Sequence, residues 1–256
     1  MMDVLPPPLI GFERPAIIRR ATPDLLLPVT GMVPGAMPVP GRPKPASAAS
    51  VVYNNGVASS ASSRTYTGIA GGAEDPARRY LVTTFGGGTA RTLNSFTVNS
   101  VEVERIFTGS FFCAGVTDII PTGTTINGYV EWNGTKSCFA LMVCRMTNVV
   151  NKLPHASSPG SISFASLVAS ATIDVPAGAV IAGYYHGGGA NKRTVTWAGA
   201  TEAFDADIRT IASDGYSETH SGAVAAVSGF EAGRVVSVTL SGEPGDSKVA
   251  YAWVFE

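Results

Sequence analysis

Hydrophobic and polar residues alternate along two segments of the chain, residues 125–132 and residues 235–240. A period of two residues is typical of a strand that buries one face. Two further segments, residues 138–143 and 249–255, are apolar on both faces, as expected for central strands that are covered on both sides. The pattern predicts an all-β protein, an antiparallel β-sandwich of the jelly-roll or Ig-like kind.

The β region also contains an internal repeat. Its matching segments follow in the same order and are 80–88 with 180–189, 91–104 with 193–202, 121–134 with 231–242, and 138–146 with 248–255. This order predicts two pseudo-repeats, at about residues 50–150 and 155–256, with seven or so strands each. The repeats can form two tandem Ig-like domains or interleave into one sandwich of twelve to fourteen strands. We favour one sandwich, since the apolar last strand of the first repeat needs cover on both faces.

Residues 1–46 have a different character from residues 47–256. Eleven of the seventeen prolines lie in this first segment, and they leave no room for a helix of ordinary length. Most of the segment is therefore expected to be an extended arm, which reaches roughly 100 Å at ~3.1 Å per residue. We treat residues 1–46 as an anchoring arm and residues 47–256 as the β-sandwich.

The arm is too apolar for a solvated linker. Its large hydrophobic residues include Phe12, Ile17, Ile18 and Leu25 to Leu27. Proline restricts the free chain, so such an arm loses less conformational entropy when it docks on another protein. Packing of the arm on its own sandwich is the alternative.

Composition and charge exclude several classes of function. The formal net charge is −1 and only 14% of residues are charged, so no basic field attracts nucleic acid. The N-terminus lacks the pattern of a secretory signal, and no apolar stretch is long enough to span a bilayer. We expect a product that is soluble in the cytoplasm where it is made, with neither membrane nor nucleic acid as partner.

Candidate chemistry is sparse, and we expect no enzyme and no cofactor. The three histidines and three cysteines have none of the spacings of a zinc site. The cysteines are expected to be buried thiols, and the alternative is a disulfide between Cys113 and Cys138 or between subunits. Asp205, Asp207 and Asp214 are expected to be solvated carboxylates, with a calcium site as the alternative.

Three further segments carry local predictions. Asn54-Asn55-Gly56 is predicted to form a turn, and so are the glycine runs at 86–88 and 187–189. Tyr184 and Tyr185 are the preferred candidates for an exposed aromatic platform that binds glycans, whereas the tryptophans are expected to be buried.

Three segments carry a resemblance to a known family: residues 11–28, 120–134 and 194–205. Together with the doubled layout, they make the chain resemble β-sandwich proteins encoded among the virion structural genes of tailed phages and prophages of alphaproteobacteria. The resemblance implies a non-enzymatic virion structural or accessory protein, at the head as decoration, at the neck or collar, or in the tail, located in the virion after synthesis in the bacterial host cytoplasm. Its partners would be other virion proteins and copies of itself. A receptor- or glycan-binding module of a tail fibre is the alternative.

The arm residues expected to bind these partners are apolar anchors and arginines. They are Phe12, Arg14, Ile17, Ile18, Arg19, Leu25, Leu26 and Leu27.

Overall fold

The computed structural model describes residues 46–161, 166–189, 194–209, 217–241 and 248–256. All of them belong to one compact unit, Lys44–Glu256. The arm lies outside the described residues. Within the described part of the chain there is no helix, and hence no helix that could cross a membrane.

The described residues form seventeen strands. In chain order the strands of the first repeat are β1 (Ala48–Val57), β2 (Ala61–Ala70), β3 (Arg79–Gly86), β4 (Leu93–Val98), β5 (Val101–Glu102), β6 (Glu104–Thr108), β7 (Phe112–Val116), β8 (Thr125–Lys136) and β9 (Phe139–Thr147). Those of the second repeat are β10 (Ala156–Ser161), β11 (Val168–Val175), β12 (Val180–Gly189), β13 (Val195–Ala198), β14 (Thr201–Arg209), β15 (Ser217–Ala226), β16 (Glu231–Leu240) and β17 (Lys248–Phe255).

These strands pair into four antiparallel sheets. The first repeat forms sheet A, in the order β1-β9-β3-β7-β6, and sheet B, in the order β2-β8-β4-β5. The second repeat forms sheet C, in the order β10-β17-β12-β15-β14, and sheet D, in the order β11-β16-β13. No described sheet mixes strands of the two repeats, so the repeats do not interleave as we favoured from the sequence.

Each repeat has the topology of an eight-stranded jelly roll. In the first repeat β5 and β6 together act as one strand that pairs with β4 in sheet B and then with β7 in sheet A. The remaining neighbours, such as β1 with β9 and β2 with β8, pair first with last and second with second-last, as two nested Greek keys require. We call this unit roll 1.

The second repeat, roll 2, follows the same strand order. β10 to β17 take the places of β1, β2, β3, β4, β5–β6, β7, β8 and β9. The four matching sequence segments fall on equivalent strands, namely β3 with β12, β4 to β6 with β13 and β14, β8 with β16, and β9 with β17. The predicted internal repeat and the all-β sandwich class are therefore confirmed.

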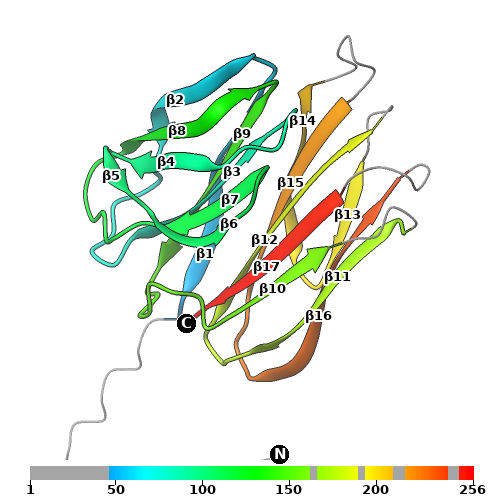
Figure 1. Ribbon diagram of the computed structural model, residues 1–256. Coiled ribbons are helices and arrows are strands. Elements are labelled where there is room, and N and C mark those ends of the chain that lie inside the picture. The colour runs from blue at the N-terminus through cyan, green and yellow to red at the C-terminus, as the bar shows by residue number, and fades with distance from the viewer. Residues whose placement is uncertain (1–45, 162–165, 190–193, 210–216, 242–247) are drawn as a thin grey trace, which may run out of the picture. The chain divides into compact units, whose positions relative to one another are not determined.

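The four sheets are stacked in the order B, A, C, D (Figure 1). One core lies between sheets B and A and includes Trp132 and Phe96. A second core joins the two rolls across sheets A and C, with Met142 on one side and Trp253 on the other. Each fully buried large apolar side chain contributes about 1.5–3 kcal/mol, so this shared core holds the two rolls face to face.

The central strands and the alternating strands behave as the sequence pattern indicates. β9 is buried on both faces, because Leu141 packs toward sheet B and Met142 toward sheet C. β8 and β16 bury alternate residues, and Val236, Val238 and Leu240 form the buried set of β16.

Two turn predictions are wrong. Asn54-Asn55-Gly56 continues β1, where Asn54 and Gly56 pair with Met142 and Ala140 of β9. Gly187–189 forms the end of β12, where all three residues pair with β15 and Gly187 also pairs with Lys248 of β17. In both cases pairing with a long central strand outweighs the turn preference of the residues. Only the run at 86–88 leaves its strand, and Gly88 adopts a positive φ of 87° there.

Candidate functional site

Ionisable side chains gather in the interface between the two rolls. His186 of β12 and His220 of β15 are direct cross-strand partners, and both are almost completely buried. Their rings contact aromatic side chains, with the centroid of His186 4.0 Å from that of Phe85 and the centroid of His220 5.0 Å from that of Phe204. Two imidazoles thus face sheet A within a largely apolar layer.

Burial keeps both imidazoles neutral. It lowers the pKa of His186 to about 3, with a smaller contribution from neighbouring His220, and it lowers the pKa of His220 to about 4. Neither nitrogen of His220 has a hydrogen-bond partner among the described residues. A charged form would gain little in this environment, so the pair is uncharged at neutral pH.

Cys138 and Glu218 lie at one end of the same interface. The Cys138 thiol donates a hydrogen bond to Oε2 of Glu218. Both residues adjoin Gly87, at which a Cβ would lie 2.5 Å from the Cys138 Sγ. Cys138 is completely buried and Glu218 is 7% exposed, so the thiol lies away from solvent among the described residues and the contact ties the two rolls together.

Small residues allow the rolls to approach closely. A Cβ at Gly56 of β1 would lie 2.7 Å from the backbone Cα of Ile208 in β14. We therefore expect Gly56→Ala to lower the free energy of unfolding by about 1–3 kcal/mol, because the backbone of β14 cannot yield as a flexible side chain would. Urea denaturation measures this loss.

Gly229→Ala is the matched control for Gly56→Ala. A Cβ at Gly229 meets nothing within 4 Å, so its stability should stay within about 0.5 kcal/mol of the parent. Equal stability of the two variants would contradict the close approach of β1 and β14.

The accessible site is a groove at the edge of roll 1, of about 190 Å³. Its lining residues lie in segments 98–103 and 117–120. The first segment is the β4–β5 hairpin with Val103, which links β5 to β6, and the second is the connection that follows β7. Val98, Val103 and Thr117 are buried, whereas Val101 and Ile119 are 59% and 46% exposed. We call this feature the hairpin groove.

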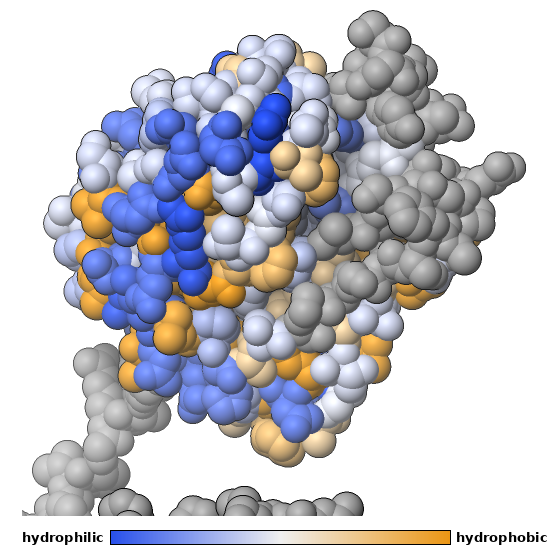
Figure 2. Space-filling view, in the orientation of Figure 1, coloured by the Kyte–Doolittle hydropathy of each residue, from blue (hydrophilic) through white to orange (hydrophobic). Residues whose placement is uncertain are grey.

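The space-filling view is consistent with exposed apolar side chains in this region. Figure 2 shows hydrophobic surface between hydrophilic residues over the left of roll 1, where Figure 1 places β5. β5 also stands last in the described order of sheet B, and β6 stands last in that of sheet A. The groove therefore opens along the edges of two sheets.

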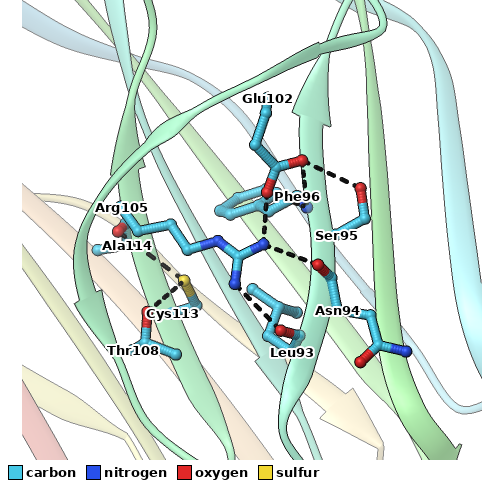
Figure 3. A network of polar contacts seen from close by, with 9 residues as sticks. All are labelled: Leu93, Asn94, Ser95, Phe96, Glu102, Arg105, Thr108, Cys113 and Ala114. Atoms are coloured by element: carbon cyan, nitrogen blue, oxygen red, sulfur yellow. Dashed lines mark hydrogen bonds and ion pairs between the residues drawn. The ribbon is translucent and has the colours of Figure 1, made fainter.

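A tight hairpin and a carboxylate–guanidinium network shape the first wall of the groove. Asn99 and Ser100 both have positive φ, 50° and 66°, as a two-residue turn between paired strands requires. Glu102 accepts hydrogen bonds from the backbone N–H of Phe96, at 3.1 Å, and from Arg105 (Figure 3). Arg105 in turn donates to the carbonyl oxygens of Leu93 and Asn94, at 3.0 and 2.9 Å, which fastens the β5–β6 strand to β4.

A buried arginine holds the second wall. The guanidinium of Arg78 donates to the carbonyl oxygens of Ile120, Thr122 and Gly123, each at 2.8 Å. It also donates to those of Gly72 and Ala73, at 3.2 and 3.0 Å. Arg78 is fully buried, and its five hydrogen bonds fix the chain between β7 and β8 beside the groove.

Ion pairs border the groove on its outer side. Lys152 lies 2.6 Å from Asp118 and 3.0 Å from Glu104. The hydrogen bond from Lys152 lowers the pKa of the Asp118 carboxyl, and the same contact raises the pKa of Lys152. Exposed Val150 and Leu153 flank Lys152 in the chain, so apolar surface continues near this rim.

The arm residues expected to bind partners lie outside the described residues. They are Phe12, Arg14, Ile17, Ile18, Arg19, Leu25, Leu26 and Leu27. Asp214, one of the three candidate carboxylates, also lies outside the described part of the chain.

The candidate disulfide is not formed in this structure. Cys113, Cys138 and Cys144 are all buried thiols. The Cys113 side chain packs in the core between sheets A and B, whereas Cys138 packs with Ile208 of roll 2. The two side chains project from opposite faces of sheet A, so a bond between them would require rearrangement of that sheet.

The aromatic platform is not exposed. Tyr184 and Tyr185 have no exposed surface, because β12 is a central strand of sheet C with sheet A on one face and sheet D on the other. The prediction of an exposed site at these two residues is wrong. Trp132 and Trp253 are buried as expected, and Trp197 is partly buried.

The described residues contain no group of three or more metal-ligating side chains. Asp205 accepts a hydrogen bond from the backbone N–H of Val195, at 3.2 Å, and the Thr219 hydroxyl lies 3.5 Å from an oxygen of Asp207. The two carboxylates therefore take part in contacts between strands.

Sequence reasoning missed the hairpin groove. Its residues come from two segments separated by β6 and β7, and no local motif joins them. The signal that the sequence offered for the groove was an apolar residue, Ile119, directly after the charged Asp118 in a stretch rich in turn-forming residues. No protein-family model matches the chain, and neither a curated protein nor a solved structure is detectably similar to it.

Proposed function

We propose that the chain is a non-enzymatic structural or accessory component of a tailed-phage virion, attached to its neighbours by the N-terminal arm. Its place would be the head surface, the neck or collar, or the tail. The β unit would form a rigid block, and the arm would link that block to capsid, neck or tail proteins and to other copies of the chain.

The observation that carries the proposal is the joining of two jelly rolls to an apolar, proline-rich arm. Jelly rolls occur in viral capsid proteins and in lectins, and one fold can serve many functions. The ionisable groups between the rolls are sealed from solvent, and the aromatic candidates for glycan binding are buried. The accessible features of the described unit are an exposed apolar groove and sheet edges, which suit assembly with other proteins.

We expect substitutions in the arm to prevent incorporation of the full-length chain into particles. In the variant Ile17→Asp/Ile18→Asp/Leu26→Asp, three apolar anchors become charged, so docking would place charges in an apolar contact. Gel analysis of purified particles measures incorporation, and circular dichroism of the free protein checks the fold.

The control is Ala36→Ser, which changes an arm residue that is not an apolar anchor. This variant should be incorporated into particles as the parent is. Normal incorporation of the triple variant, or of a chain lacking residues 1–46, would refute the role of the arm. The copy number of the parent in the same particles distinguishes the locations, since hundreds of copies indicate the head and about a dozen the neck or tail.

A further inference from the structure

We propose that the hairpin groove binds residues 12–20 of the arm of a second copy of this chain, so that copies associate head to tail. This inference rests on the proposed function and names one partner of the arm. A contact between an arm and a groove is heterologous, and such contacts form a ring when the rotation closes.

The groove has the form that an extended peptide requires. Its floor contains the buried Val98 and Val103, and the exposed Val101 and Ile119 stand at its rim. The groove runs along sheet edges, where an extended chain can add main-chain contacts while its side chains enter pockets. Its volume of about 190 Å³ far exceeds the space of ~10–15 Å³ that one water molecule needs, so side chains fit.

The groove and the arm segment are complementary in chemistry. The charged residues in the lining are both carboxylates, Glu102 and Asp118, while their cationic partners Arg105 and Lys152 lie outside the lining. Residues 12–20 combine Phe12, Ile17 and Ile18 with three arginines and a single glutamate. Apolar side chains can therefore enter the groove while arginines reach carboxylate oxygens at its rim.

The position of the arm's attachment favours a groove on another copy. The arm joins the β unit at Ala46 and Ser47, which are bound to Asn148 by hydrogen bonds of 3.2 and 3.1 Å. Thr117, which lines the groove, directly follows β7. In sheet A, β7 is three strands away from β1, so the groove lies about 14 Å across the sheet from the strand at which the arm is attached.

Residues 21–45 separate the binding segment from this attachment point and contain seven prolines. If this linker were extended throughout, it would span roughly 80 Å at ~3.1 Å per residue, which is enough to reach the groove of a neighbouring copy. To bind the groove of its own copy, such an extended linker would have to turn back on itself.

Cross-linking of two differently labelled full-length chains tests the proposal. One chain carries Ile18→Cys and the other carries Ile119→Cys, and the native cysteines are buried. We expect a short bismaleimide to give a heterodimer when the two chains are mixed. Phe230→Cys, a 68% exposed position in roll 2, replaces Ile119→Cys in the control and should give roughly tenfold less product.

Two further measurements make the result decisive. Val101→Lys, added to the Ile119→Cys chain, should suppress the heterodimer because it puts a positive charge on an apolar rim, where it repels the arginines of the arm. A chain that carries both Ile18→Cys and Ile119→Cys tests whether the arm binds the groove of its own copy. If that chain links only within itself while the mixed chains stay monomeric, the arm occupies its own groove and the proposal fails.

Equal product from Ile119→Cys and Phe230→Cys would also overturn the proposal. In either case, the full-length chain could still be found in purified particles, so failure of the groove contact is distinguishable from failure of the virion function.

Discussion

Replacing Arg78 by methionine should lower the free energy of unfolding by about 3–5 kcal/mol. The variant leaves five backbone carbonyl oxygens without the guanidinium that they share, from Gly72 and Ala73 on one side to Ile120, Thr122 and Gly123 on the other. Each buried acceptor that loses its partner costs about 1–3 kcal/mol, and water can replace part of this loss at the loop surface. Denaturation in urea at neutral pH measures the change.

Arg78→Lys should fall between the parent and the methionine variant. Lysine keeps the charge but has three donors on a flexible stem, and the planar fork that reaches five oxygens is lost. Arg79→Met is the control, because the Arg79 guanidinium donates a long hydrogen bond, of 3.4 Å, to the carbonyl oxygen of Thr117. We expect the free energy of unfolding to fall by less than about 1 kcal/mol in this control. Equal losses for Arg78→Met and Arg79→Met would contradict the stabilising role of the five hydrogen bonds of Arg78.

Arg78→Met should also affect the hairpin groove. Three of the five carbonyl groups belong to the connection between β7 and β8, and that of Ile120 belongs to a residue that lines the groove. Release of this connection would let Ile119 move relative to the β4–β5 hairpin. If the groove binds the arm as proposed, stability and arm binding would be coupled through one buried side chain.

The sequence predicted strands where a single physical effect decides the pattern. β8 and β16 alternate because each has one face in a core, and β9 is apolar throughout because sheet B covers one face and sheet C the other. The sequence therefore indicated that both faces of β9 are packed against other sheets. The sequence did not indicate which sheet packs on the second face, because that depends on which faces of two similar rolls meet.

The errors arise where tertiary pairing outweighs local preference. Asn54-Asn55-Gly56 has the composition of a turn, yet β9 is long enough to pair with all three residues. Tyr184 and Tyr185 resemble a polar-tipped surface pair in sequence, but they occupy opposite faces of a central strand, and both faces are covered. The groove escaped prediction because its two walls come together only when β5 and β6 cross from sheet B to sheet A.

We expect the β unit to lose about 4 kcal/mol of stability between pH 7.5 and pH 5 through His186 and His220. Their pKa values fall from 6.5 to about 3 and about 4 on folding. Between these values and 6.5 the unfolded chain binds more protons than the folded one, so stability decreases as the pH falls. At pH 5 each imidazole lies 1.5 units below its unfolded pKa, which corresponds to about 2 kcal/mol per group.

The double variant His186→Leu/His220→Leu separates this effect from that of other titrating groups. Both positions face an aromatic layer that accepts apolar side chains, and Glu218 and Cys138 remain in place at the end of the interface. The variant should lose markedly less stability than the parent over the same pH range, as measured by urea denaturation at each pH. Parallel losses in the parent and the variant would show that the imidazoles are solvated or partnered when protonated, and that the interface between the rolls does not depend on their neutrality.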